Sequence, residues 1–308
     1  MKKNNEVTIV TAFFDIGRGN ANEEMKRTNE QYVSYFEFWS GIKNNIIVYT
    51  EPQYKDKVIE IRKKHGLEDK TRIITIENVT ELLPELYEKA VANSLEEKYV
   101  NWRYLKHVLD LNPKYDHVMF MKNYFLKDSY DKNYIKTDYV AWLDFGFNHG
   151  GRFIEKKETF SVKWEMNNEE KIVISAPKVD DNAPIFTIIQ SGEVYVEGGV
   201  YVIPKNLLTK FYDVMLESYN SLLDCGLLDD DQTILLMTTR KEKDMFIYER
   251  MSCYELVKKY INNEMTIKKR IPPKENLFDK LLYKYRVIKR NRIYLKGIKK
   301  SFLKDYLD

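Results

Sequence analysis

One carboxylate stands at the end of an apolar, β-prone run of sequence. Residues 139–143 are all hydrophobic, and Asp144, Phe145 and Gly146 follow them. In open α/β sheets, ligands bind just beyond the carboxyl ends of the strands. Asp144 is therefore placed to face a substrate or a metal ion, and Gly146 allows the backbone to come close. The same triplet is also an ordinary way to leave a strand through a turn, so the pattern alone leaves both interpretations open.

A second set of residues could complete a site for a polyanion. Arg18 lies between two glycines in a polar turn after the first apolar run, and three acids, residues 229–231, precede an apolar helical run. A diphosphate requires positive donors or a divalent cation, which Arg18 and a Mg²⁺ or Mn²⁺ ion on Asp144 would supply. Asp231, and after it Asp230, could remove a proton from an acceptor hydroxyl. The alternatives are a solvated arginine in a flexible turn and acids that only cap a helix.

Four other residues allow both a functional and a structural interpretation. Gly198 and Gly199 would leave room for an acceptor sugar against the backbone, or would mark a bulge or tight bend. His149 could ligate a metal beside Asp144, but the chain has only four His, without paired spacing, which favours a surface or hydrogen-bonded role. Lys122, on a predicted helix, is either a phosphate clamp or a solvated side chain. For each of these residues, the sequence leaves both the functional and the structural interpretation open.

The hydrophobic pattern predicts an α/β fold that would bring these residues to one edge of a sheet. In the first half of the chain, buried strands alternate with helical periodicity, which indicates parallel βαβ units. The predicted strands are 7–14, 45–50, 71–76 and 139–144, and the predicted helices are 23–39, 54–65 and several segments within 82–132. A mainly parallel central sheet flanked by helices follows from this order.

The pattern changes after residue 150. Residues 159–164 and 171–176 are shorter and more alternating, which favours strands of an antiparallel extension. Residues 194–204 are β-rich but interrupted by the glycine pair, and an amphipathic helix is predicted over 207–223. We therefore expect one domain over residues 1–270.

Composition places the chain among soluble globular proteins. It has 308 residues, of which 44% are hydrophobic and 31% charged, and no uninterrupted apolar run reaches the roughly 18 residues of a membrane-spanning helix. The first residues show no secretion signal, so a cytoplasmic location is expected. Cys225 and Cys253 are the only cysteines. They predict neither a disulfide framework nor a thiolate metal site, and both are expected to be buried.

Positive charge is concentrated at the end of the chain. Residues 280–308 contain ten Lys or Arg and two Asp, a sum of +8, so the net charge of +3 leaves about −5 for residues 1–279. Apolar residues recur there at helical spacing, so we predict a basic amphipathic tail over 271–308. It could lie on an anionic membrane surface or pack on its own domain. Nucleic acid is not expected as a partner, because the body of the chain is acidic.

Three segments carry a resemblance to a known family. Residues 7–19, 142–146 and 229–232 resemble the bacterial HtrL/YibB family, which is placed with GT-A type glycosyltransferases, and the similarity extends over most of residues 7–250. The resemblance implies a GT-A-like, Rossmann-like α/β fold and a nucleotide-sugar donor, with a UDP-sugar favoured. It also implies a glycan or lipid-linked glycan acceptor in capsule or lipopolysaccharide biosynthesis, with the protein cytoplasmic or peripheral on the inner face of the membrane.

The resemblance also implies roles for individual residues. Thr11, Ala12 and Phe13 would border the nucleoside, and Arg18 would contact the diphosphate. Asp144 would take the place of the GT-A metal-binding acid, for Mn²⁺ or Mg²⁺. The remaining donor-site residues are Glu51, at the end of the second predicted strand, and Lys122, at a polar or basic helix position.

The chain departs from the GT-A pattern at one point. A GT-A metal site usually has Asp-x-Asp, whereas here Gly146 stands in place of the second acid, and no His follows His149. The cation would then be held more weakly or be absent. A kinase is a rival interpretation, because residues 144–146 also match a kinase magnesium motif, but the companion kinase motifs are missing. A non-catalytic, membrane-peripheral glycan-binding or scaffold subunit is the other alternative.

Overall fold

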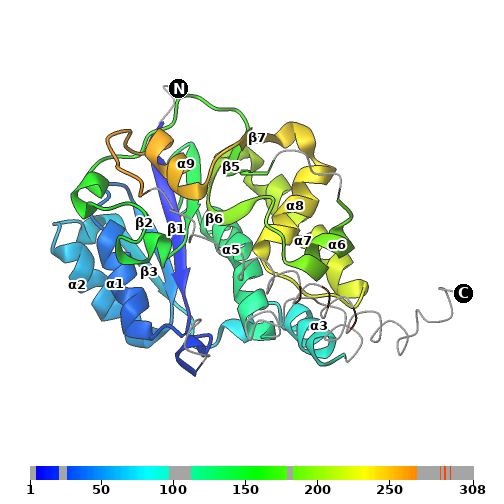
Figure 1. Ribbon diagram of the computed structural model, residues 1–308. Helices are drawn as coiled ribbons and strands as arrows, with labels where there is room; N and C mark the ends of the chain where they lie inside the picture. The colour runs from blue at the N-terminus through cyan, green and yellow to red at the C-terminus, as the bar shows by residue number, and fades with distance from the viewer. Residues whose placement is uncertain are drawn as a thin grey trace, which may run out of the picture.

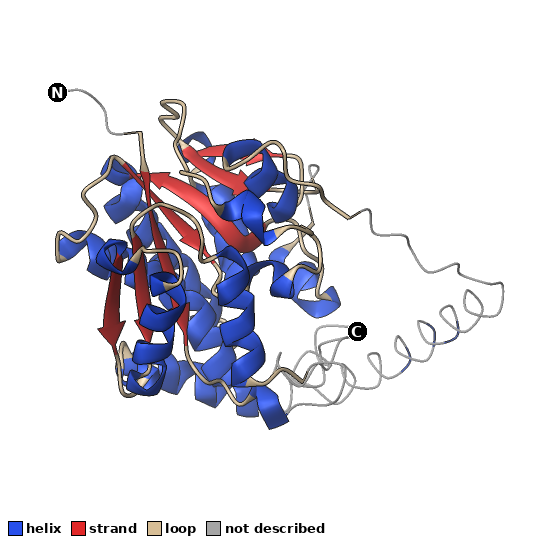
Figure 2. Cartoon of the chain, turned by 90° about the vertical axis from the view of Figure 1, so that its left-hand side faces the viewer, coloured by secondary structure: helices blue, strands red, loops and turns tan. Residues whose placement is uncertain are grey.

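The core of the protein is a mixed seven-stranded sheet with the strand order β3-β2-β1-β4-β6-β5-β7 (Figures 1 and 2). The computed structural model describes residues 5–20, 26–96, 112–178 and 183–268, together with Tyr285, Ile288 and Arg292. The strands are β1 Val7–Phe13, β2 Ile46–Thr50, β3 Thr71–Thr75, β4 Tyr139–Leu143, β5 Ile172–Ser175, β6 Glu197–Pro204 and β7 Phe246–Glu249.

Strand directions divide the sheet into two halves. Strands β1, β2, β3 and β4 are mutually parallel, whereas β6 runs antiparallel to both β4 and β5, and β7 is parallel to β5. The parallel half and the antiparallel extension both match the predictions. The sheet with its flanking helices confirms the predicted α/β class.

Helices cover both faces of the sheet, because alternate side chains of each buried strand point to opposite faces. From β1, Val10 belongs to one hydrophobic core and Ile9 to the other. Figure 1 shows α1 and α2 on one side of β1 and α5 and α7 on the other. The second core takes side chains from α1 Asn29–Trp39, α2 Lys55–Lys63 and α9 Cys253–Tyr260. The first takes them from α3 Pro84–Leu95, α5 Pro113–Asp131, α6 Ile185–Ser191, α7 Leu208–Asp224 and α8 Asp231–Lys241.

Three local predictions are corrected by the structure. The helix expected from residue 23 begins at Asn29, because Thr28 and Gln31 form a capping box there; residues 21–25 lie outside the described residues. Residues 159–164 form no strand. The side chain of Asn44 bonds the backbone N–H and C=O of Trp164, and the same C=O accepts the Val7 N–H of β1, but the segment does not become a strand of the sheet. Cys253 is buried as expected, but Cys225 is exposed.

The glycine pair does not interrupt its strand. β6 runs on through Gly198 and Gly199, but its pairing with β5 is irregular there. Ile174 pairs with Tyr201 and the next residue, Ser175, pairs with Glu197, so the glycine pair lies in a bulge of β6, as one of its two interpretations predicted. After Pro204, a single 3₁₀ turn leads into α7, close to the predicted start of that helix.

The predicted basic tail lies outside the described residues, apart from the exposed Tyr285, Ile288 and Arg292. The boundary at residues 270 and 271 lies outside them as well. Within the described part of the chain, no helix combines the length and the hydrophobicity needed to span a membrane.

Candidate functional site

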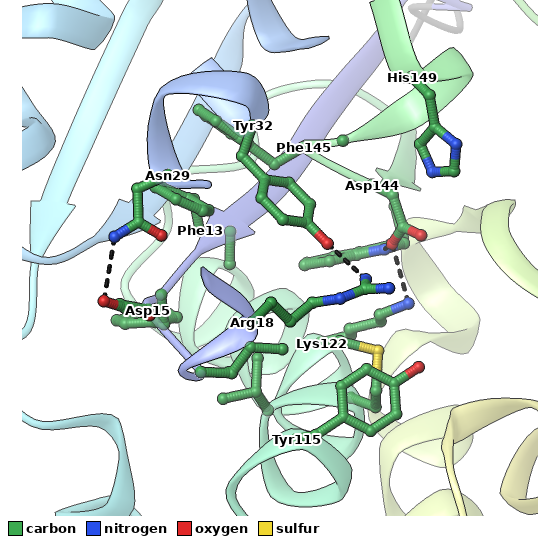
Figure 3. Close-up of a pocket in the computed structure, with 17 residues that line it drawn as sticks. Phe13, Asp15, Arg18, Asn29, Tyr32, Tyr115, Lys122, Asp144, Phe145 and His149 are labelled. Carbon is green, nitrogen blue, oxygen red and sulfur yellow. Dashed lines mark hydrogen bonds and ion pairs between the residues drawn. The ribbon is translucent and has the colours of Figure 1, made fainter. Parts of the chain in front are cut away.

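A pocket of about 150 Å³ opens at the carboxyl ends of β1 and β4 (Figure 3). The loop after β1 contributes Asp15 and Arg18, and the loop after β4 contributes Asp144. Helix α5 contributes Lys122. This is the edge at which parallel α/β sheets bind ligands. The prediction that the β1 turn and the Asp144 strand meet at one edge of the sheet is confirmed.

A buried lysine joins the two acids that the sequence singled out. The Lys122 ammonium lies 2.8 Å from Asp144 Oδ1 and 2.8 Å from Asp231 Oδ2, and it donates to the Gly198 carbonyl at 3.3 Å. The Lys122 side chain is only 4% exposed, so it is not a solvated lysine. Asp144 is 38% exposed and lines the pocket, whereas Asp231 is 7% exposed and is not among the lining residues. The cluster therefore presents Asp144 to ligands and keeps Asp231 behind Lys122.

The glycine pair leaves space that the acids occupy. A Cβ atom on Gly198 would stand 1.9 Å from Asp231 Oδ2, so only glycine allows the carboxylate to sit there. A Cβ on Gly199 would stand 3.6 Å from Asp144 Oδ2. The Gly199 carbonyl also accepts the backbone N–H of Asp144 at 3.0 Å. Gly198 thus makes room for Asp231, while Gly199 anchors the strand exit at Asp144.

Burial and ion pairing oppose each other in this cluster. Burial raises the pKa of Asp231 to about 7, although the positive charge of Lys122 works in the other direction. For Lys122, burial alone would lower the pKa, but the charges of Asp144 and Asp231 together with their hydrogen bonds raise it above the usual value. Lys122 is therefore a cation at neutral pH. Near pH 7, Asp231 exchanges a proton more readily than an ordinary aspartate does.

The acids of residues 229–231 separate into different roles. Asp230 caps α8, since its Oδ1 accepts the Gln232 backbone N–H at 3.0 Å, and Asp229 accepts the Thr233 hydroxyl at 2.6 Å. Asp231, one position further, points to Lys122. The capping interpretation thus applies to Asp230, and Asp231 is the acid of this group in the Lys122 cluster.

Arg18 supplies a second cation to the pocket. Its Nη1 donates to the Tyr32 hydroxyl at 2.5 Å, and the guanidinium lies 5.9 Å from the centre of the Tyr32 ring. Its Nε is buried without a hydrogen-bond partner. Figure 3 shows Arg18 between Asp15 on one side and Lys122 with Asp144 on the other. An anionic group in the pocket would satisfy the orphaned N–H.

The opposite end of the pocket carries a polar network. Asp15 accepts the Asn29 side-chain amide at 3.0 Å and the Gly17 backbone N–H at 2.8 Å. These two hydrogen bonds hold the pKa of Asp15 below its usual value. Glu51, expected at the donor site, is outside the set of lining residues and instead accepts the Asp15 backbone N–H at 3.1 Å. Glu51 therefore supports the loop that carries Asp15.

Aromatic side chains form the wall between the two ends. The rings of Phe13 and Phe145 stack with their centres 4.9 Å apart, and Phe145 also stacks on Phe36 at 4.6 Å. The Trp39 indole N–H donates to the Phe145 carbonyl at 3.1 Å. Helix α1 and strand β1 together fix the loop that follows Asp144.

The three predicted nucleoside contacts on β1 differ in their placement. Ala12 and Phe13 line the pocket. Thr11 does not, because its fully buried side chain lies inside the fold, where Oγ1 has no hydrogen-bond partner.

His149 lines the pocket in an unusual backbone conformation. Its φ of 44° is in the left-handed region, within the turn after Asp144. Burial, followed by the nearby charges of Arg27, Arg152 and Arg18, lowers the pKa of His149 to about 4. The imidazole is therefore neutral at physiological pH, and its Nδ1 has no hydrogen-bond partner.

Comparison with known proteins assigns the chain to a family. The family described as "Bacterial protein of unknown function (HtrL_YibB)" matches residues 5–262. The chain belongs to this HtrL_YibB family. Protein HtrL of Escherichia coli (strain K12) is 30% identical over 246 residues, which cover 78% of this chain and 86% of HtrL. Among solved structures, mouse xyloside xylosyltransferase 1 in its apo form is similar with a TM-score of 0.41 and 11% identity, covering 79% of this chain and 84% of that one.

The family assignment made from three short segments is therefore confirmed. All three segments lie within the residues that match the HtrL_YibB family. The pocket is also built within this match, since Asp15, Arg18, Lys122 and Asp144 all fall between residues 5 and 262. The site thus belongs to the part of the chain that defines the family.

The atoms around Asp144 do not fit the divalent cation that a GT-A resemblance implies. Oδ1 of Asp144 already accepts Trp142 Nε1 at 2.7 Å and faces Lys122 at 2.8 Å. Within the residues that the structure describes, no group of three or more His, Cys, Asp or Glu side chains could hold a metal ion. The arginines that disfavour a charged His149 also disfavour a metal ion beside it. Asp144 as a metal ligand stays a prediction that this donor set does not favour.

Sequence reasoning missed several residues of the pocket. Asp15 follows the end of β1 much as Asp144 follows β4, and this repetition could have identified it. Asn29 and Tyr32 lie on α1 and face Asp15 and Arg18, respectively. No signal in the sequence distinguishes these α1 residues from ordinary polar and aromatic positions of a helix.

Proposed function

We propose that this HtrL_YibB member transfers a sugar from a nucleotide-sugar donor to a glycan acceptor. One observation carries the proposal: the cations Arg18 and Lys122 and the half-exposed carboxylate of Asp144 line one pocket at the carboxyl ends of β1 and β4. Two cations suit a diphosphate, and a carboxylate next to them suits the sugar or the attacking hydroxyl.

The polarity of the pocket suggests an orientation for the donor. Asp15 and Asn29 at one end can accept and donate hydrogen bonds to a base or ribose, next to the Phe13 ring. The diphosphate would lie near Arg18 and Lys122, and the sugar would extend toward Asp144 (Figure 3). A UDP-sugar is our first choice of donor.

The chemistry can be written with these residues alone. The oxygen of an acceptor hydroxyl bonds the anomeric carbon while the bond from that carbon to the diphosphate breaks. Arg18 and Lys122 stabilise the negative charge on the leaving diphosphate. Of the two carboxylates in the cluster, Asp144 is open to the pocket, so we propose that it takes the hydroxyl proton and that Asp231 holds Lys122 in place. The sequence-based choice of Asp231 as base remains the rival assignment.

The proposed acceptor and the proposed location both come from the sequence. A glycan or lipid-linked glycan of the capsule or lipopolysaccharide rests on the sequence resemblance. Attachment to the inner face of the membrane through residues 280–308 rests on the basic composition of that segment.

The test measures thermal shifts with UDP-, GDP-, CMP- and dTDP-sugars and with ATP, followed by turnover of the sugar that binds. We expect a shift with one nucleotide-sugar. In addition, Asp144→Asn should lose turnover and remain folded, whereas Asp224→Asn, at an exposed and distant position, should behave like the wild type. A shift with ATP alone would point to phosphotransfer, and the absence of any shift would point to a non-catalytic scaffold.

A further inference from the structure

The ammonium of Lys122 occupies the place between the two acids that a bridging cation would need. It lies at equal distances of 2.8 Å from Asp144 Oδ1 and Asp231 Oδ2, and the Gly198 carbonyl is its third acceptor. An ammonium has three N–H donors, so these contacts match its full capacity. Because the side chain is 4% exposed, it is held in this position by the surrounding fold.

The position of the missing second acid is also closed. A Cβ atom on Gly146 would stand 2.8 Å from Cε1 of Tyr32, so an aspartate would require the tyrosine ring to move. That ring is held in turn, since it packs at 5.5 Å from Phe13 and its hydroxyl accepts Arg18 Nη1. In an Asp-x-Asp site, a second carboxylate at this position would bind the metal. Here the position is filled by the Tyr32 ring, whose hydroxyl is hydrogen-bonded to the Arg18 guanidinium.

Two side-chain cations of the protein line the pocket, beside the carboxylates of Asp15 and Asp144. Arg18 and Lys122 both line it, so a bound diphosphate would meet two fixed cations on the protein. A divalent ion on the remaining oxygen of Asp144 would lie close to the Lys122 ammonium, and the two positive charges would repel each other.

We propose that Lys122, together with Arg18, takes the place of the divalent cation at this site, so that nucleoside diphosphate binds without Mn²⁺ or Mg²⁺. This inference rests on the proposed function. It adds that the leaving diphosphate is stabilised by side chains of this chain alone.

The first experiment titrates the protein without nucleotide with Mn²⁺ and follows free Mn²⁺ by electron paramagnetic resonance. We expect no saturable binding below millimolar Mn²⁺. Micromolar binding that Asp144→Asn removes would overturn the inference, whatever nucleotide the protein takes.

The second experiment measures the affinity for UDP by calorimetry, in EDTA and in millimolar Mn²⁺, and repeats it with GDP, CDP and dTDP. The affinity for the nucleotide that binds should agree within about twofold between the two conditions. A tenfold or greater loss in EDTA would overturn the inference while leaving the proposed function intact. If none of the four binds in either condition, the proposed function fails and the inference fails with it.

Variants assign the charge to its residue. Lys122→Met should weaken nucleotide binding at least thirtyfold, with no recovery on adding Mn²⁺, and Arg18→Met should weaken it as well. Lys127→Met, on the same helix and paired with Asp131 away from the pocket, is the matched control and should bind normally. If Lys122→Met does not fold, as judged by circular dichroism, Arg18→Met decides the same point. Wild-type affinity in a folded Lys122→Met protein, or in Arg18→Met when the former cannot be used, would overturn the inference.

Discussion

Among the residues that the structure describes, Arg62 and Lys122 are buried cations, and their surroundings differ. Arg62, on α2, is fully buried and donates to the carbonyls of Ser40, Ile42 and Asn44 and to the hydroxyl of Thr71. Lys122, on α5, is almost as deeply buried but pairs with two carboxylates and lines a pocket.

The difference shows what each cation does for the molecule. Burial lowers the pKa of Arg62 to about 10, with no carboxylate charge opposing it. Its acceptors are uncharged carbonyl groups, and these hydrogen bonds tie α2 to the segment before β2. The carboxylates around Lys122 raise its pKa instead, and one of them is open to ligands. A buried cation that is held by backbone carbonyls stabilises the fold. A buried cation that is held by carboxylates beside a pocket can also act on a ligand. Four predictions test this contrast, from the largest expected effect to the smallest.

Replacing Lys122 should affect activity far more than stability. We expect Lys122→Met to reduce turnover on the order of 10³-fold, about 4 kcal/mol, because a fixed cation opposite the leaving group is lost. The free energy of unfolding should fall by only about 1–2 kcal/mol, since Asp231 has a pKa near 7 and can take up a proton. Turnover assays and urea titrations measure the two effects. If the folded variant kept full turnover, Lys122 would have a purely structural role, like Arg62.

Replacing Arg62 should have the reverse effect. Arg62→Met leaves the three carbonyls and Thr71 without their donor, so we expect the unfolding free energy to fall by about 3 kcal/mol or more. Nucleotide affinity of the folded fraction should not change. Urea denaturation and calorimetry provide the measurements, with the exposed Arg72→Met as control. A loss of affinity with unchanged stability would contradict the comparison.

His149 offers a third case, a neutral group among cations. Because its folded pKa is about 4 and its unfolded pKa about 6.5, the unfolded state binds the proton more tightly. Stability is unaffected above pH 6.5 and falls as pH drops below it, by about 1 kcal/mol at pH 5, because solvent screens this partly exposed ring. His149→Asn, which tolerates the left-handed backbone, should flatten this dependence. Unfolding curves between pH 5 and 8 test it, and equal slopes in both proteins would exclude His149 as the cause.

The smallest effect is expected at an exposed ion pair. Lys89 and Asp224 lie 2.8 Å apart with side chains 47% and 63% exposed. Lys89→Ala should change the unfolding free energy by about 0.5 kcal/mol or less, because solvent screens the pair. A loss comparable with that of Arg62→Met would mean that burial is not what separates these cations.

Much of the framework could be predicted from local patterns. The strand that ends before Asp144 and the helix that begins at Asp231 were both expected, because apolar runs and acidic helix starts are local signals. The segment 159–164 was misread because the side chain of Asn44, distant in sequence, bonds the backbone of Trp164. Lys122 lies on the apolar face of its helix, with Val118, Phe125 and Leu126 as its neighbours at helical spacing, so its burial had a local signal. Its ion-pair partners had none, because they are distant in sequence.

The sequence by itself determined the family, the α/β class and the placement of Asp144 at a strand exit, because these depend on residue types along short stretches. Only the tertiary structure decided that Lys122 pairs with both Asp144 and Asp231. Asp231 is 109 positions away from the lysine in the sequence. The same holds for Tyr32, whose ring fills the space beside Gly146 and whose hydroxyl accepts a hydrogen bond from Arg18. Such contacts depend on how distant elements pack around the sheet, and no local pattern encodes them.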